Sequence, residues 1–255
     1  MEKEDCDTYK LKYLKYKAKY IQLKKQTNAK KNIGGNFNED YLKDYLAMLK
    51  NLYPTCVKKP TESSGKTFET YGEMEYVGVE KLCNHIDTDN LEYFIDIGSG
   101  RGKLPCWFAN LPNIKKSIGI EIVSQRHLDG IELVSNLSKS FPTITEKILL
   151  LEGSFEQYNL GELVSHSPNV LVWISNLCFG EELSDMIFAQ ILEQLERKTI
   201  ICCSKKPSNI ISDYTLNNDI SKNDEHTKKI FLREIIQIQM SWWNNLSDVY
   251  VCEIV

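Results

Sequence analysis

The chain has 255 residues, of which 42% are hydrophobic and 26% are charged. These proportions exclude an intrinsically disordered chain, a collagen-like repeat and a small disulfide-stapled domain. The net charge of −4 conceals an asymmetry, because residues 1–35 carry ten Lys, no Arg and four acidic residues, whereas acidic residues are in excess in the rest of the chain. We therefore expect a basic arm attached to an acidic body, and such arms often bind nucleic acid or another polyanion.

The eight cysteines and four histidines show no spacing that is typical of a metal site, so we expect no bound metal. The first twenty residues lack the continuous apolar core of a secretory signal. No stretch approaches the roughly 18 apolar residues that a membrane-spanning helix needs. We therefore expect an intracellular protein with reduced thiols and no membrane contact.

Within the arm, residues 8–31 predict a helix, because Tyr9, Tyr13, Tyr16 and Tyr20 recur at alternating spacings of four and three residues. The same segment holds nine Lys and no acidic residue, and a Gly-Gly pair ends the pattern soon after it. Two interpretations stay open. The segment is either a helix that binds nucleic acid or a partner, or a solubilising or processing segment with no binding role.

Beyond the arm, we expect a helical lead-in over 36–90 and a core over 91–255. Short apolar runs, as in buried parallel strands, occupy 91–98, 117–123, 147–153, 169–175 and 198–204. Helical patterns occupy 39–52, 75–86, 103–110, 125–140 and 181–196, and a final antiparallel pair is expected over 231–243 and 249–255. The polar stretch 208–229 is expected to be mobile. Strands that alternate with helices predict a doubly wound α/β sheet.

A glycine-rich turn follows the first expected strand, in the order Asp96-Ile97-Gly98-Ser99-Gly100-Arg101-Gly102-Lys103. Glycine lets the backbone turn sharply and approach a ligand, and ligands of open α/β sheets bind at the carboxyl ends of the strands. Glu121 ends the second strand, where an acid can accept both ribose hydroxyls of an adenosine. An acid before the glycines suits a cationic sulfonium better than a pyrophosphate. The pattern therefore favours S-adenosylmethionine over a nicotinamide cofactor, and the alternative is a purely structural turn.

A third contact with the ligand is expected where the third strand ends, at Glu152-Gly153-Ser154-Phe155. Phe155 either stacks on the adenine or is an ordinary core residue.

Three further segments carry motifs, and they read Tyr71-Gly72-Glu73, Ser175-Asn176-Leu177-Cys178-Phe179-Gly180 and Ser204-Lys205-Lys206-Pro207. Together with FIDIGSGRGK and GIEI, over about residues 37–255, they make the chain resemble the disruptor-of-telomeric-silencing (Dot-one) family of histone lysine methyltransferases. The resemblance implies a class I, seven-stranded, Rossmann-like S-adenosylmethionine-dependent methyltransferase fold with a helical N-terminal region, and not the SET fold. It also implies that the target is a lysine on the globular face of the nucleosome, in core histone H-three.

The resemblance implies site residues by motif. Those implied for the cofactor are Tyr71, Gly72, Glu73, Met74, Phe94, Asp96, Gly98, Ser99, Gly100, Gly102, Lys103, Glu121, Ser154, Phe155 and Asn176. Those implied beside the target lysine are Asn176, Trp242, Trp243 and Tyr250. Two alternatives stay open, namely that Asn176 caps the next helix and that one of the tryptophans is a core residue. The chain departs from the family at three positions, where a small hydroxyl residue, an acid and an uncharged amide are usual and this chain has Met74, Ser154 and Lys103.

Methyl transfer requires a deprotonated lysine, whose free pKa is about 10.4. An apolar aromatic channel disfavours the ammonium form by desolvation, and Asn176 can accept a hydrogen bond from the amine, so no dedicated general base is needed.

The expected function is lysine methylation on a nucleosome that contains host or viral histones, with the arm 8–31 binding DNA phosphates. The arm also resembles amino-terminal segments that are common in proteins of giant DNA viruses. The expected locations are accordingly the nucleus or the viral factory of the host cell, or the virion. Two alternatives remain, a chromatin-binding module without turnover and a methyltransferase for RNA or a non-histone protein.

Overall fold

The structure, a computed structural model, describes residues 39–54, 73–208, 210–211, 228–241 and 246–255. Its strands are β1 Tyr93–Ile97, β2 Lys116–Glu121, β3 Ile148–Glu152, β4 Val170–Ile174, β5 Ile200–Cys203, β6 Ile210–Ile211, β7 Ile230–Gln239 and β8 Leu246–Ile254. Its α-helices are α2 Glu39–Leu52, α3 Tyr76–His85, α4 Lys103–Phe108, α5 Ser124–Ser138, α6 Pro142–Thr145, α7 Leu160–Leu163 and α8 Glu181–Gln194. Two 3₁₀ turns are η2 Phe155–Gln157 and η3 Asn176–Cys178.

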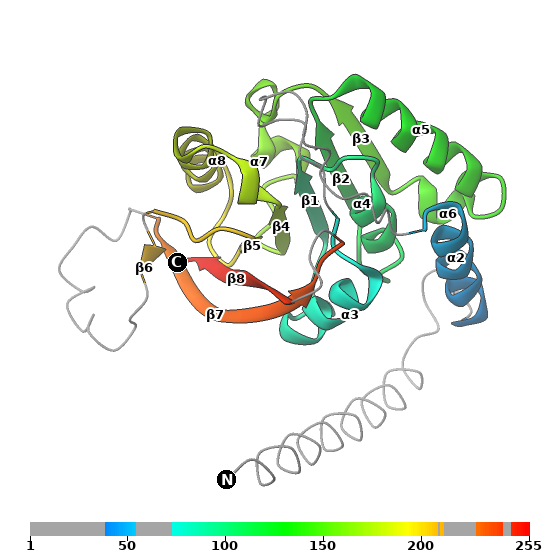
Figure 1. The fold of residues 1–255 in the computed structure, drawn as a ribbon, viewed down its shortest axis with the longest axis horizontal. Helices are drawn as coiled ribbons and strands as arrows, with labels where there is room; N and C mark the ends of the chain where they lie inside the picture. Colours follow the sequence, from blue (N-terminus) through cyan, green and yellow to red (C-terminus); the bar gives the residue numbers. More distant parts are fainter. Residues whose placement is uncertain (1–38, 55–72, 209, 212–227, 242–245) are drawn as a thin grey trace, which may run out of the picture. The chain divides into compact units, whose positions relative to one another are not determined.

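All of these strands belong to one sheet in the order β3-β2-β1-β4-β5-β8-β7-β6 (Figure 1). The pairs between β3 and β5 are parallel, and β8 pairs antiparallel with both β5 and β7. The predicted doubly wound sheet with a final antiparallel pair is therefore confirmed, and the seven expected strands are present. The two-residue strand β6 is an addition. It lies within the polar stretch 208–229, which was expected to be mobile, and it pairs parallel with β7. Residues 209 and 212–227 of that stretch lie outside the described residues.

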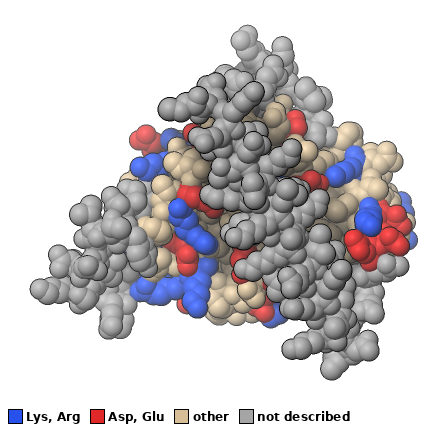
Figure 2. Space-filling view, turned by 90° about the horizontal axis from the view of Figure 1, so that it is seen from below, with Lys and Arg blue, Asp and Glu red and all other residues tan. Residues whose placement is uncertain are grey.

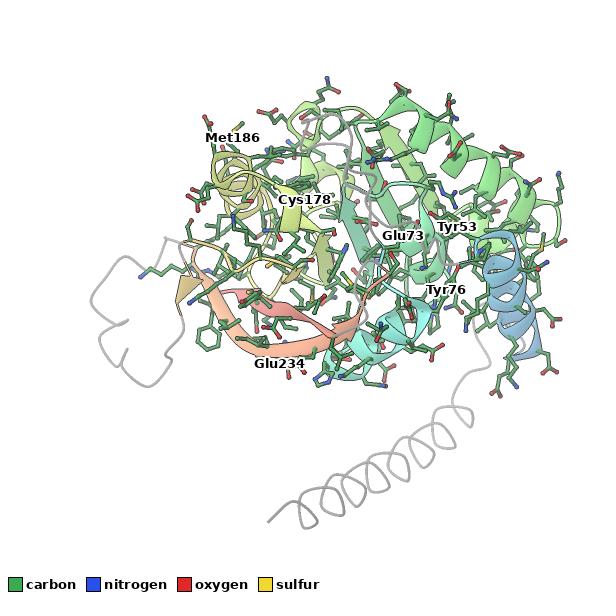
Figure 3. All side chains as sticks on the ribbon, in the orientation of Figure 1. Tyr53, Glu73, Tyr76, Cys178, Met186 and Glu234 are labelled. Atoms are coloured by element: carbon green, nitrogen blue, oxygen red, sulfur yellow. The ribbon has the colours of Figure 1, made fainter. Side chains whose placement is uncertain are left out.

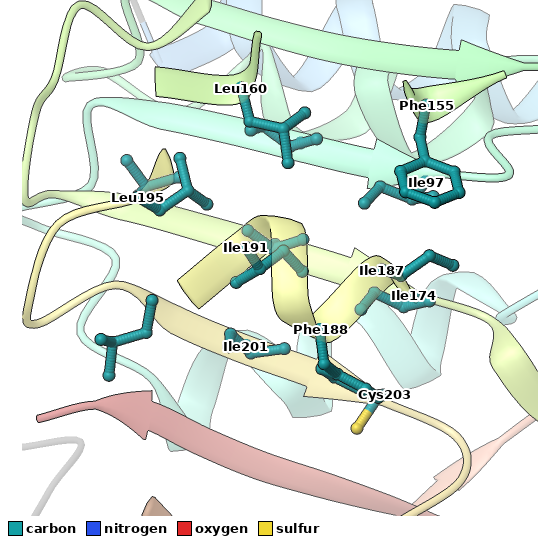
Figure 4. Packing of buried hydrophobic residues seen from close by; sticks show 14 of the residues in the cluster. Ile97, Phe155, Leu160, Ile174, Ile187, Phe188, Ile191, Leu195, Ile201 and Cys203 are labelled. Atoms are coloured by element: carbon teal, nitrogen blue, oxygen red, sulfur yellow. The ribbon is translucent and has the colours of Figure 1, made fainter. Parts of the chain in front are cut away.

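The apolar runs become strands because both faces of the sheet are covered, so that each run is buried over its whole length. On one face, Ile95 of β1, Val172 of β4 and Ile201 of β5 are register neighbours and lie in one hydrophobic cluster. Helix α8 packs Ile187 and Ile191 into this cluster (Figure 4). Full burial of a side chain of this size contributes about 1.5–3 kcal/mol, so this face carries much of the stability of the fold.

The opposite face of the sheet carries the alternate residues and is covered by α3 and α4. Phe94 of β1 stacks on Phe108 of α4 with ring centroids 3.9 Å apart. Helix α2 adds a further contact, because the hydroxyl of Tyr45 donates to the carbonyl of Cys106 at 2.7 Å. This second face is the one that holds polar side chains at the carboxyl end of the strands.

The lead-in segment before α3 is fixed to the end of β7. The N–H of Glu75 donates to the carbonyl of Gln239 at 3.1 Å, and the N–H of Ser241 donates to the carbonyl of Glu73 at 2.8 Å. An isolated antiparallel bridge joins Met74 and Met240. These bonds bring residues 73–75 beside a strand far away in the sequence.

Short helices depart from the expectation. Phe141 and Pro142 follow the expected helix over 125–140, and Pro142 begins the additional short helix α6. Proline suits the first turn of a helix, since the N–H that it lacks has no partner within the helix there. Within the described ranges, no helix combines the length and the apolarity that crossing a bilayer requires.

Candidate active site

A small hollow opens at the carboxyl ends of β1 and β4. It is lined by Glu73, Met74, Asp96, Gly98, Ser99, Lys103, Leu104, Trp173 and Ser175. Most of these residues are ones that the sequence predicted for the cofactor, and they come from the lead-in, from the glycine turn and from β4.

The backbone of the glycine turn explains its sequence pattern. Gly98, Gly100 and Gly102 have φ angles of +82°, +56° and +77°, a region that side chains with a Cβ rarely adopt. The N–H groups of Gly98 and Ser99 donate to the carbonyl of Ile120 at 2.9 and 3.0 Å. The turn is therefore held against the end of β2 with its left-handed residues at alternate positions.

Glu121, the last residue of β2, is 4% exposed and has a fixed carboxylate. One oxygen accepts the N–H of Gly100 at 2.7 Å, and the other accepts the N–H of Val123 at 2.8 Å. Each carboxylate oxygen can accept more than one hydrogen bond, so both keep capacity for hydroxyl donors of a ligand.

Asp96 lies in the hollow and is 3% exposed. Burial, followed by the nearby Glu121 carboxylate, raises the pKa of Asp96 well above its ordinary value. In the described part of the chain, no Lys or Arg side chain forms an ion pair with it. A buried carboxylate in this situation is stabilised by a cationic ligand, because the ligand offsets both the lost hydration and the repulsion from Glu121.

Lys103 begins α4 and is also buried, at 3% exposure. Its Nζ donates to the carbonyl of Met74 at 2.7 Å, lies 3.5 Å from Glu73 Oε2 and sits 4.4 Å from the ring centroid of Tyr76. Burial lowers the pKa of Lys103, and the Glu73 carboxylate opposes that shift. Figure 3 shows Glu73 and Tyr76 grouped with Tyr53 near α2 and α3. The ion pair thus joins the glycine turn to the lead-in segment.

Asn176 follows β4 and is 1% exposed. Its side chain accepts the N–H of Lys205 at 2.8 Å and donates to the carbonyl of the same residue at 3.3 Å. The alternative that Asn176 caps the next helix is wrong, since α8 begins at Glu181 with Gly180 before it. Asn176 instead ties the end of β4 to the loop after β5, and its neighbour Ser175 lines the hollow.

Several predicted site residues lie away from the hollow. Phe94 is fully buried against Phe108, and Phe155 packs into the cluster beneath α8, as Figure 4 shows. The Ser154 hydroxyl donates to Glu156 at 3.1 Å. Tyr250 packs against the same cluster as Phe155, which is on the face of the sheet opposite to Asp96. The remaining predicted residues Tyr71, Gly72, Trp242 and Trp243 lie outside the described residues.

Three residues that line the hollow were not anticipated, namely Leu104, Trp173 and Ser175. A signal for Trp173 exists in the sequence, because β1 and β4 are parallel neighbours in which Asp96 and Trp173 are register partners. Register partners point to the same face of a sheet, so alignment of the two apolar runs would have placed Trp173 beside Asp96.

The sequence was compared with known proteins. Residues 55–254 match the model of a family described as histone methylation protein DOT1. A Caenorhabditis elegans protein named "Histone-lysine N-methyltransferase, H3 lysine-79 specific" is 28% identical over 195 residues. That match covers 69% of this chain and 20% of the relative, so the chain spans about a fifth of the length of the curated protein.

Solved structures of methyltransferases are also similar. One is a putative O-methyltransferase from Klebsiella pneumoniae, with a TM-score of 0.48, 12% identity and coverage of 90% of this chain and 94% of that one. Another is an RNA methyltransferase from Salinibacter ruber in complex with S-adenosyl-L-homocysteine, with a TM-score of 0.46, 13% identity and coverage of 71% and 92%. The family match extends over most of the sequence, from the lead-in to the last strand, and this chain therefore belongs to the DOT1 family of histone methylation proteins.

Proposed function

We propose that this chain is an S-adenosylmethionine-dependent lysine N-methyltransferase that acts on a core histone of the nucleosome. Membership of the DOT1 family supports the proposal. The observation that carries it is the buried carboxylate of Asp96, which begins a glycine turn and faces a hollow at the carboxyl edge of a parallel sheet.

The residues around the hollow fit the proposed cofactor. Asp96 would bind its cationic amino group, and Glu121, already oriented by two backbone N–H groups, would accept its ribose hydroxyls. Leu104 and Trp173 supply apolar surface that excludes water from the same space. When bound, S-adenosylmethionine supplies a methyl group on a positively charged sulfur.

On the substrate side, the chain must hold a lysine in its neutral form. From the family resemblance we carry over Asn176, Trp242 and Trp243 to this role, as a hydrogen-bond acceptor and as aromatic walls. Burial disfavours the ammonium form and so lowers the lysine pKa. In the structure, the Asn176 side chain holds the loop after β5 through two hydrogen bonds to the backbone of Lys205.

Contact with a nucleosome needs a cationic surface for DNA phosphates. Where grey atoms do not cover the face in Figure 2, Lys and Arg side chains are interspersed with Asp and Glu side chains. The proposed DNA contact is the basic arm, residues 8–31, since it carries nine Lys and no acidic residue. The proposed locations are the nucleus or a viral factory, and a viral source remains a prediction from the arm alone.

A transfer assay tests the proposal. The full chain is incubated with radiolabelled S-adenosylmethionine and, separately, nucleosomes, free histones and RNA, and mass spectrometry then identifies the modified residue. We expect label on a histone lysine, loss of label with Asp96→Asn, and retention with Asp89→Asn. Asp89 is a matched control because it is exposed and precedes the amino end of β1, away from the hollow.

The alternatives predict different results. Label on RNA or on a non-histone protein, without label on histones, would replace the proposed substrate. Cofactor binding without transfer to any of these would indicate a chromatin-binding module that lacks turnover.

A further inference from the structure

A contact network outside the hollow reaches its wall from α2. Tyr53, directly after α2, is 3% exposed. Its hydroxyl donates to the Glu73 carboxylate and accepts the Nε–H of Arg101 at 2.9 Å. The guanidinium of Arg101 lies over the Tyr53 ring, with Cζ 4.2 Å from the ring centroid. The other Glu73 oxygen lies 3.5 Å from Lys103 Nζ, so the contacts run from Arg101 through Tyr53 and Glu73 to Lys103.

The network begins and ends in the glycine turn. Arg101 and Lys103 flank Gly102, whose left-handed conformation is part of that turn. Glu73 and Lys103 line the hollow, whereas Tyr53 and Arg101 are absent from its lining. Tyr53 therefore reaches the hollow through its contact with Glu73, and Arg101 reaches it through Tyr53.

The tyrosine hydroxyl suits this position because it both donates and accepts. It donates to a carboxylate and accepts from a guanidinium, and hydrogen bonds to ionised groups are about twice as strong as neutral ones. A phenylalanine at residue 53 would keep the ring beneath Arg101 but would remove a donor from Glu73. The buried Glu73, which is 8% exposed, would then hold Lys103 and the lead-in less firmly.

We propose that Tyr53 and Arg101 are positioning residues for the cofactor site, which hold the Glu73 carboxylate and thereby keep Lys103 and the lead-in in the arrangement that binds the cofactor. This inference rests on the proposed function. If only a fraction of molecules has the binding arrangement, the apparent affinity falls by that fraction. Loosening the network should therefore weaken binding without removing any group that touches the ligand.

The test is calorimetric binding of S-adenosylhomocysteine to the full chain and to four variants. We expect Tyr53→Phe to weaken binding by about three- to thirtyfold, less than the roughly 10- to 150-fold that direct loss of a hydrogen bond to a charged group can cost, because the hydroxyl does not touch the ligand. Arg101→Met should weaken it less. The double variant should lose less affinity than the sum of the two single losses, since the bond between Arg101 and the hydroxyl is already absent in Tyr53→Phe.

Tyr45→Phe is the matched control. Tyr45 is a fully buried tyrosine of α2 whose hydroxyl donates to the backbone carbonyl of Cys106 and not to Glu73. Loss of the Tyr45 hydroxyl should also lower the melting temperature, because a buried hydrogen bond is lost, while leaving the affinity unchanged. In turnover, Tyr53→Phe should raise KM for the cofactor and leave kcat at saturating cofactor within about twofold.

The outcomes separate the two proposals. Equal affinities for the wild type and Tyr53→Phe, or an equal loss in Tyr53→Phe and Tyr45→Phe, would overturn the positioning role and leave the proposed function intact. A wild type that binds no S-adenosylhomocysteine would overturn the proposed function and the positioning role with it.

Discussion

Replacing Asp96 by Asn should make the ligand-free protein more stable and at the same time weaken its binding of the cofactor. The substitution keeps the shape of the side chain and removes a charge that is 3% exposed. A hydrogen bond that involves a charged group contributes about 1.5–3 kcal/mol. With about 1.4 kcal/mol per tenfold change, we expect Asp96→Asn to weaken binding of S-adenosylhomocysteine by about 10- to 150-fold.

The effect on stability has the opposite sign and depends on pH. Burial and Glu121 raise the pKa of Asp96 in the folded state, so its protonated form favours folding. That contribution is fully present below the unfolded pKa of about 3.9 and is lost as the pH rises through the folded pKa. Asn does not titrate. The free energy of unfolding of Asp96→Asn should therefore equal that of the wild type near pH 4. At higher pH the variant should become the more stable of the two, and the difference should become constant above the folded pKa of Asp96.

Single stabilising substitutions commonly raise the free energy of unfolding by about 0.5–2 kcal/mol, and we expect removal of the buried Asp96 charge to fall in this range. For a unit of this size, 1 kcal/mol corresponds to about 2–4 °C in Tm. Thermal unfolding of both proteins from pH 4 to pH 8 in the same buffers, followed by calorimetric titration, measures the two effects. A variant that is less stable than the wild type at neutral pH, or that binds the ligand equally well, would refute the reasoning.

Two other substitutions test the packing. Gly119→Ala should lower the free energy of unfolding by about 1–3 kcal/mol, since an added Cβ would lie 2.7 Å from Ser99 Oγ in the glycine turn, and urea unfolding measures this. Ile191→Ala, at a fully buried position of α8, should cost about 2–5 kcal/mol. Met186→Ala on the same helix, where the side chain is 42% exposed, should stay within about 0.5 kcal/mol, and comparable losses in the two variants would contradict the assigned core.

The fold was predictable because its strands are short apolar runs, and the position of a polar residue at the end of a run has a physical meaning. Asp96 and Glu121 stand near the ends of two such runs, and the carboxyl ends of parallel strands meet at one edge of the sheet. Their spacing in the sequence was therefore sufficient to bring both carboxylates to the glycine turn, where Glu121 accepts the N–H of Gly100.

The rest of the site depends on contacts that local patterns do not encode. Tyr53 and Arg101 are 48 positions apart in the sequence, and no periodicity connects the end of a helix with a turn after a strand. The two open interpretations of Phe155 differ only in which way the 3₁₀ turn η2 directs the ring, and the structure directs it into the core. Tyr250 lies on the face of the sheet opposite to Asp96, which depends on the strand register. Phe94 shares the face of Asp96 but lies two residues before it on β1, where its ring stacks on Phe108 of α4.

The two faces of the sheet explain how a buried carboxylate is tolerated at the site. Ile95, Val172 and Ile201 are register neighbours on the face beneath α8, and the next residues along the same strands, Asp96 and Trp173, point the opposite way. A shift of β1 by one residue would drive Asp96 into the apolar cluster, so the register is strongly specified. Because the apolar face stabilises the fold without the ligand, the protein tolerates the free-energy cost of the buried Asp96 carboxylate until a cation binds. Ligand binding should then stabilise the fold in proportion to RT ln(1 + [L]/Kd), and that increment should be much smaller in Asp96→Asn at the same ligand concentration.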